Sequence, residues 1–132
     1  VHKFILQIFC RSNHIAYCSN LAICSTDGRI QWDAIAPPGI KLQLLHVLKH
    51  TDLAAYYGQT GFHILSEDEY VDLVIRCLEV LSPDITIHRL TGDGPSDLLI
   101  APLWSLKKRS VLNHIHHELK VRDTWQGRLF TE

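Results

Sequence analysis

The sequence has no methionine, starts at Val1, and lacks any apolar run near the ~20 residues of a membrane-spanning helix. A short apolar stretch, Val1–Cys10, is not followed by a small-residue cleavage site at the distance of a signal peptide. These absences predict a cytoplasmic chain that is not associated with a membrane. The missing methionine and the start at valine indicate a fragment, an unusual start codon or a trimmed sequence.

Neither sign of charge is in excess. Thirteen Lys and Arg residues stand against fourteen Asp and Glu, and the formal net charge is −1. Composition therefore gives no sign of a strongly basic face that binds nucleic acid by charge alone. Apolar residues make up 46% and charged residues 20% of the 132, which is typical of one globular domain or part of one.

Motifs of common cofactor and metal sites are also missing. Cys10, Cys18, Cys24 and Cys77 have spacings that match neither a zinc site nor an iron–sulfur site. No Walker loop, Gly-x-Gly-x-x-Gly or Gly-x-Ser-x-Gly occurs. The run from His114 to Glu118 lacks the metalloprotease order His-Glu-x-x-His, so it favours a solvated helix face. We therefore predict no catalytic residue and no metal ligand from motifs.

A regular pattern begins at Gly39. Alternating and then continuously apolar residues predict a strand over Ile40–Leu48. Ser66 and Glu69 form a capping box at the start of a helix with one broad apolar stripe, and Pro83 stops it. A second strand follows over Asp84–Leu90. Strand, helix and strand in this order predict a parallel βαβ unit, and hence an α/β fold.

Shorter elements surround this unit. The patterns predict a strand within His2–Phe9, a turn at Thr26–Arg29, a helix over Asp52–Tyr57 ended by Gly58, an apolar piece at Leu98–Ala101, a helix over Leu106–Lys120 capped by Ser105, and a tail, Arg122–Glu132, lying on the surface. Trp104 and Trp125 are interpreted as packing residues, because no RNA-binding signature surrounds them.

Polar side chains gather where the two main strands end. Parallel sheets place ligand sites outside the carboxyl ends of their strands, so these side chains are candidates for a substrate or cofactor mouth. The alternative is that they are ordinary polar residues bordering loops, and position alone favours neither. The candidates are Lys41, His46, Lys49, His88, Arg89 and Asp93.

The stretch from Gly39 resembles a known family. The residues that carry the resemblance are Gly39–Thr51, Glu69-Tyr70-Val71, His88-Arg-Leu-Thr-Gly-Asp93, Leu99-Ile-Ala-Pro-Leu-Trp-Ser-Leu106, Arg122-Asp123 and Gln126-Gly127. In this order they are similar to the C-terminal part of radical SAM proteins of the YhcC type, and a related extension occurs in the catalytic subunit of elongator. The resemblance divides the chain into an atypical leader, residues 1–38, and a radical SAM C-terminal region, residues 39–130.

The resemblance implies part of a (β/α) barrel with a C-terminal helical extension. Intact members bind a 4Fe-4S cluster and S-adenosylmethionine through Cys-x-x-x-Cys-x-x-Cys, which is absent here. We therefore expect a fragment that closes the barrel and shapes the substrate mouth, with no cofactor and no activity alone. Its partner would be the missing N-terminal half of the barrel. The alternative is a non-catalytic module that binds a protein partner or, by analogy only, RNA.

Overall fold

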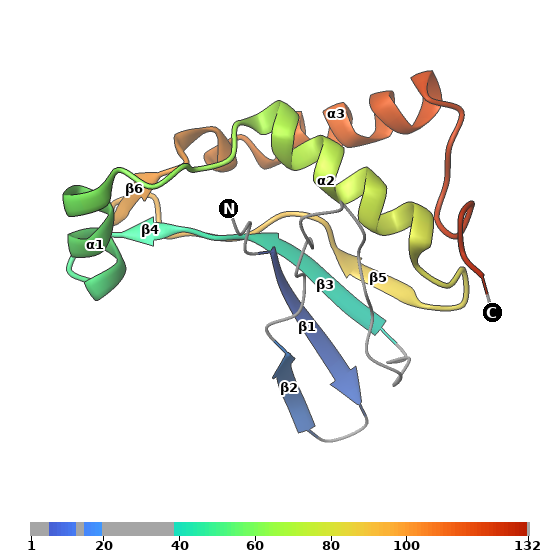
Figure 1. Cartoon of the computed structure of the whole chain (residues 1–132), viewed down its shortest axis with the longest axis horizontal. Helices are drawn as coiled ribbons and strands as arrows, with labels where there is room; N and C mark the ends of the chain where they lie inside the picture. The colour runs from blue at the N-terminus through green and yellow to red at the C-terminus, as the bar shows by residue number, and fades with distance from the viewer. Residues whose placement is uncertain (1–5, 13–14, 20–38, 132) are drawn as a thin grey trace.

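A computed structural model describes residues 6–12, 15–19 and 39–131, and this part of the chain is mixed α/β (Figure 1). A four-stranded sheet has the order β2-β1-β3-β5, and a two-stranded sheet pairs β4 with β6. The strands are β1 (Leu6–Ser12), β2 (Ile15–Ser19), β3 (Gly39–Leu44), β4 (Val47–Leu48), β5 (Thr86–Arg89) and β6 (Leu99–Ala101). The helices are α1 (Asp52–Thr60), α2 (Glu67–Val80), the 3-10 helix η1 (Leu103–Leu106) and α3 (Lys108–Val121).

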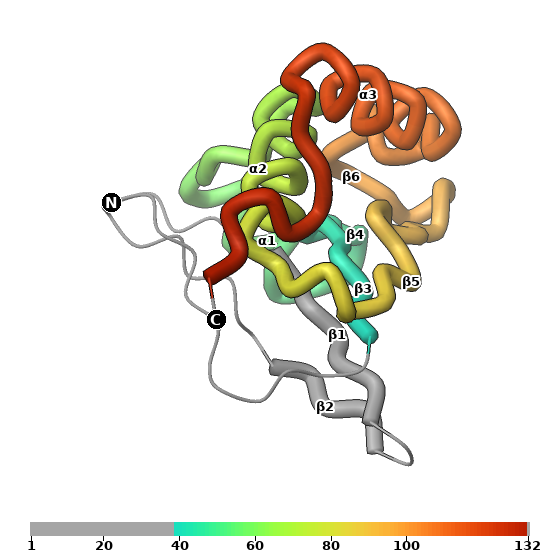
Figure 2. The backbone as a smooth tube through the Cα atoms, turned by 90° about the vertical axis from the view of Figure 1, so that its right-hand side faces the viewer, coloured from blue at the N-terminus to red at the C-terminus, as the bar shows by residue number. Residues whose placement is uncertain are grey.

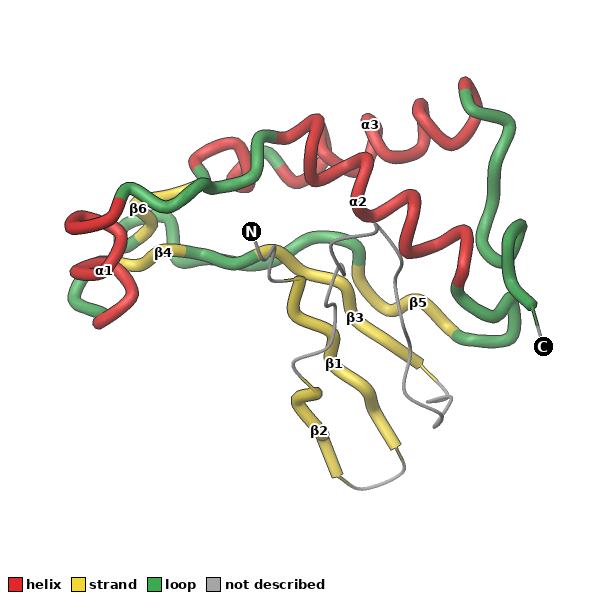
Figure 3. Tube along the Cα trace, viewed as in Figure 1, coloured by secondary structure: helices red, strands yellow, loops and turns green. Residues whose placement is uncertain are grey.

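The predicted parallel pair is present. β3 and β5 are hydrogen-bonded neighbours, with Gly39 opposite Thr86 and Ile40 opposite Ile87. A β-bulge then shifts the register, so that Lys41 is the cross-strand partner of Arg89. The sequence prediction of an α/β fold with a parallel βαβ unit is thereby confirmed. The tube in Figure 3 shows α2 running back over the sheet between these two strands.

The single strand predicted over Ile40–Leu48 is wrong. β3 ends at Leu44, and the two residues of β4 pair antiparallel with β6 in the other sheet. Leu42, Leu44 and Val47 are all buried. The continuous apolar run therefore reflects burial in two different sheets, whereas the prediction took it as one strand buried on both faces.

The predicted end of the first helix is also wrong. Gly58 lies inside α1, which continues to Thr60 and ends at Gly61. Gly61 has φ +55°, the left-handed conformation common after helices, and its N–H donates to the Tyr57 carbonyl at 2.8 Å. Gly58 and Gly61 are only three residues apart, and the sequence pattern does not show which of them ends the helix.

The capping box of α2 is confirmed. The Glu69 N–H donates to Ser66 Oγ at 3.2 Å, and the Ser66 N–H donates to Glu69 Oε2 at 2.8 Å. His63 Nε2 lies 2.9 Å from the same carboxylate oxygen. Backbone hydrogen bonding to Ser66, and then the contact with His63, lower the pKa of Glu69.

Ser105 does not cap the last helix. It lies in η1, where its hydroxyl donates to the Pro102 carbonyl, and α3 begins only at Lys108 without a side-chain cap. The neighbouring Trp104 donates from Nε1 to the Leu65 carbonyl at 3.0 Å and packs against Tyr70. This tertiary anchoring of the indole holds the segment in a 3-10 turn before the α-helix starts.

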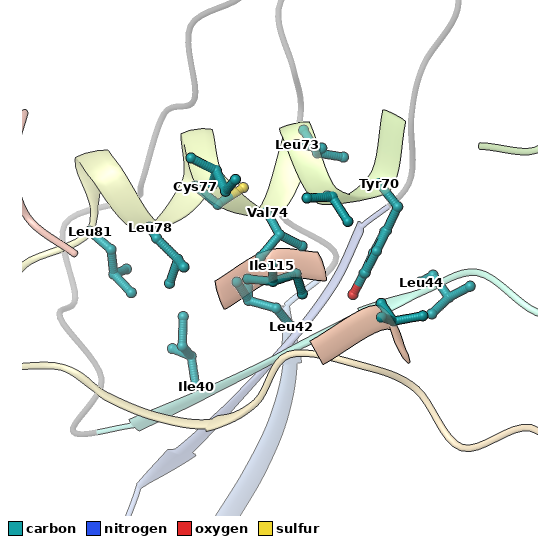
Figure 4. Packing of buried hydrophobic residues seen from close by; sticks show 13 residues of the cluster. Ile40, Leu42, Leu44, Tyr70, Leu73, Val74, Cys77, Leu78, Leu81 and Ile115 are labelled. Carbon is teal, nitrogen blue, oxygen red and sulfur yellow. The ribbon is translucent and has the colours of Figure 1, made fainter. Parts of the chain in front are cut away.

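Both long helices cover the same face of the larger sheet (Figures 1 and 2). The core between them and the sheet includes Ile40, Leu42 and Leu44 of β3, the apolar stripe of α2, and Val111 and Ile115 of α3 (Figure 4). Burial raises the pKa of the Tyr70 hydroxyl, which donates to the Leu90 carbonyl at 2.8 Å. Since side chains alternate along β3, Lys41 and Gln43 belong to the face away from the helices.

The C-terminal tail lies on the surface, as predicted, and the structure places it against the end of α2. The Gly127 N–H donates to the Leu78 carbonyl at 2.9 Å, and Gln126 Nε2 donates to two carbonyls in the loop that follows α2. Trp125 was wrongly predicted to be a packing residue, because it is 58% exposed with the Arg128 guanidinium over its ring. Trp104 has the predicted packing role.

The predicted strand within His2–Phe9 overlaps β1 (Leu6–Ser12), and the part of the prediction before Leu6 lies outside the described residues. β1 pairs antiparallel with both β2 and β3. The turn predicted at Thr26–Arg29 lies outside the described residues.

Candidate site at the carboxyl ends of β3 and β5

Two cations face each other across the parallel strands. Lys41 and Arg89 are partners in the register of β3 and β5, directly after the β-bulge. Within the described residues, Lys41 forms no ion pair. Like charges placed opposite each other destabilise a strand pair, so this arrangement favours an anion nearby.

Asp93 supplies one negative charge. Its carboxylate forms one ion pair with Arg89 Nη1, at 3.1 Å, and a second one with Lys108 Nζ. The three side chains are 39 to 49% exposed, so water screens these pairs and each contributes little to stability. Arg89 and Asp93, both candidates from the sequence, are thus in contact, and Lys108, the first residue of α3, contacts the same carboxylate.

Lys108 was missed by sequence reasoning. It lies fifteen positions beyond Asp93, on another element, and nothing in its local pattern relates it to the strand ends. One signal was available: Lys107, Lys108 and Arg109 come together at the start of a helix, where the helix dipole disfavours positive charge. Three cations in that position point to a compensating anion from elsewhere in the fold.

His46 packs beneath the loop that carries Asp93. A Cβ atom at Gly92 would lie 2.4 Å from His46 Cε1, and one at Gly94 would lie 2.9 Å from His46 Cδ2, so two glycines are needed for this close approach. His46 Nε2 is buried and has no hydrogen-bond partner in the part of the chain that the structure describes. Burial, and secondarily the charge of Lys108, lower the pKa of His46, so the imidazole is neutral at pH 7.

The candidates His88 and Lys49 contact other parts of the chain. His88 lies over Gly39, where a Cβ atom would come within 2.3 Å of His88 Nε2. Lys49 follows β4, and its Nζ donates to the Asp97 carbonyl at 2.9 Å. The predicted approach of Lys49 to Arg89 and Asp93 is therefore wrong, because the chain leaves the main sheet before Lys49.

The histidine-rich run on α3 contacts α2. His114 Nδ1 lies 2.9 Å from Glu67 Oε1, and both side chains are more than two-thirds buried. The interpretation of this run as a fully solvated face is therefore wrong for His114, while His116 and His117 are exposed as expected. Glu118 pairs with Arg122 rather than with His114.

The described residues do not fit an iron–sulfur cluster. Cys77 is the one cysteine with a described side chain, and it is completely buried in the core beneath α2. Over the described ranges, no three His, Cys, Asp or Glu side chains are grouped in a way that could hold a metal ion. In the same ranges, no helix has the length and apolar character needed to cross a membrane.

The family described as the Radical_SAM C-terminal domain matches residues 37–121, which is well over half of the chain. The chain therefore belongs to the Radical_SAM C-terminal domain family, as the resemblance implied.

Two relatives show the same stretch within longer proteins. The uncharacterized protein YtqA of Bacillus subtilis is 46% identical over 92 residues, which is 70% of this chain and 29% of YtqA. The uncharacterized protein MJ0486 of Methanocaldococcus jannaschii is 36% identical over 92 residues, 69% of this chain and 29% of that protein. This chain thus spans less than a third of either relative. No solved structure matches it.

Proposed function

We propose that residues 39–130 are the C-terminal part of a radical SAM protein similar to those of the YhcC type, and that β3 and β5 are two adjacent strands of its barrel. In this role the segment closes the barrel and shapes the substrate mouth with Lys41, His46, His88, Arg89 and Asp93. Lys49, the sixth candidate, would lie at the rim. A 4Fe-4S cluster and S-adenosylmethionine would belong to the rest of such a protein.

One observation carries the proposal. β3 and β5 are parallel, α2 crosses between them, and both long helices cover one face, which leaves Lys41 of β3 on the other face. In a (β/α) barrel the helices lie outside and the opposite face of the strands points inward. A cationic inner face at the carboxyl ends of the strands is where such folds bind ligands.

An exchange of segments tests this role. The stretch of YtqA that matches this chain is replaced by the corresponding stretch of this chain, and the chimera is reconstituted anaerobically with iron and sulfide. We expect the chimera to hold its iron and to form 5′-deoxyadenosine from S-adenosylmethionine under reducing conditions, as we expect of YtqA itself.

Variants of the chimera test the mouth. Arg89→Ala and Asp93→Asn should lower turnover at least about tenfold without loss of iron, because they change the mouth and not the cluster site. Lys120→Ala, at the far end of α3, is the matched control and should have no effect. Full activity of both mouth variants, or a chimera that cannot hold iron while YtqA does, would contradict the proposal.

A further inference from the structure

The charges around Asp93 are not balanced. Lys41, Arg89 and Lys108 bring three positive charges to this end of the strands, and Asp93 brings one negative charge. His46 adds none at pH 7, because its pKa is lowered by burial. The cluster therefore keeps a net charge of about +2 before Lys107 and Arg109 are counted.

Two features of the fold maintain this excess at an energetic cost. The register of β3 and β5 places Lys41 opposite Arg89, where like charges repel. α3 starts with cations and without a side-chain cap, at the end of a helix that attracts anions. Both features therefore add positive charge near Asp93 that the ion pairs of Asp93 do not balance.

We propose that Arg89 and Lys108, with Lys41 beside Arg89 in the strand register, bind the terminal phosphoryl group of the substrate, and that Asp93 holds Arg89 and Lys108 in place until the phosphoryl group arrives. The inference rests on the proposed function, because it names the substrate class of the same mouth. A terminal phosphoryl group carries nearly two negative charges at pH 7 and three acceptor oxygens. It matches both the excess charge and the planar donors of Arg89.

The cluster is compact, which argues for a terminal phosphate rather than a polyanion. Two of its cations, Arg89 and Lys108, pair with one carboxylate, Lys41 is the register partner of Arg89, and the chain as a whole is nearly neutral. A nucleic-acid backbone would need cations spread along a path several phosphates long. Asp93 occupies the position of the anion, since it already accepts from both Arg89 and Lys108.

Thermal unfolding of the intact chain in inorganic phosphate tests the proposal. Phosphate from 0 to 20 mM is added at pH 7.5 and constant ionic strength, and the rise of Tm gives an apparent Kd by mass action. We expect saturation with a Kd of about 1–10 mM for the wild-type chain. Lys108→Gln and Arg89→Gln should each weaken binding about tenfold or more, and Lys120→Gln should leave it unchanged.

Asp93→Asn distinguishes a binding site from a structural brace. If Asp93 competes with phosphate for the same cations, the neutral variant should bind phosphate at least about threefold more tightly. If Asp93 only braces the loop, the variant loses stability and its phosphate affinity does not rise, and this result overturns the proposal. So does a wild-type response in Lys108→Gln and Arg89→Gln.

An RNA oligonucleotide with a 5′-hydroxyl end provides a second test, as a competitor of inorganic phosphate. It offers phosphodiesters but no terminal phosphate, so we expect it not to compete with inorganic phosphate. Tight binding of this oligonucleotide by a chain that ignores phosphate would also overturn the proposal. Phosphate binding needs neither an iron–sulfur cluster nor the rest of the barrel, so a failure to bind phosphate would not decide the outcome of the chimera experiment.

Discussion

At the scale of single residues, the contact between His46 and the glycine loop can be tested by adding one methyl group. Gly92→Ala puts a Cβ atom 2.4 Å from the half-buried His46 ring, so ring or loop must move. We expect a loss of about 1–3 kcal/mol in the free energy of unfolding, measured with denaturant.

The matched control is Gly58→Ala. Gly58 lies inside α1 with nothing near its missing Cβ atom, so alanine there should stabilise the chain by about 0.5–1 kcal/mol. Equal effects of the two substitutions would show that His46 does not pack beneath the loop.

The same histidine makes stability depend on pH. The folded chain has a His46 pKa below the ordinary value of 6.5, so near pH 6 the unfolded chain binds the proton more readily. Stability contributed by the neutral ring is therefore full above pH 6.5 and is lost as the pH falls from that value toward the lower pKa of the folded chain. We expect Tm to fall less between pH 7.5 and 5.5 in His46→Gln than in the wild type.

Other histidines also titrate in this range, so the informative quantity is the difference between the wild type and the variant. The exposed His116 provides the comparison, and His116→Gln should keep the pH dependence of the wild type. A His46→Gln profile parallel to that of the wild type would contradict a buried neutral ring.

At the scale of helices and strands, the capping box of α2 makes a measurable contribution to the free energy of unfolding. Ser66→Ala removes the oxygen that accepts from the Glu69 N–H, and we expect it to cost about 1 kcal/mol in unfolding free energy. Ser110→Ala, on the exposed side of α3, should be neutral within error. A Ser66→Ala chain as stable as the wild type would mean that water replaces the cap.

Elements with local signals could be predicted from sequence, and those set by tertiary contacts could not. The α2 stripe and capping box, the pairing of β3 with β5 and the contact of Arg89 with Asp93 follow from spacing and topology. Three features depend on partners far away in the chain: the interruption between β3 and β4 at His46, the 3-10 turn around Trp104, and the contact of Lys108 with Asp93. The candidate site was therefore predicted in its strand residues and missed in its helix residue.

At the scale of the whole molecule, cofactor binding is the next test. We expect the isolated chain, reconstituted anaerobically with iron and sulfide, to hold far less than the four irons of a [4Fe–4S] cluster, because its cysteine spacing does not match the motif. Iron content and visible absorption measure this. Near-stoichiometric iron that is lost when Cys10, Cys18 and Cys24 are replaced would contradict it.

The open edge of the sheet gives the last prediction. In the described part of the chain β5 pairs with β3 alone, so its other edge has unpaired backbone groups. Exposed apolar side chains, including Leu103, Val121 and Leu129, add to the tendency to associate. We expect the isolated chain to be oligomeric or poorly soluble in light scattering. Thr86→Lys, which puts a charge on the exposed β5 residue, should shift it toward monomer, because lysine on an edge strand opposes pairing, whereas Thr60→Lys at the end of α1 should not. A wild-type chain that is a monodisperse monomer and unfolds cooperatively would show that this edge needs no further strand.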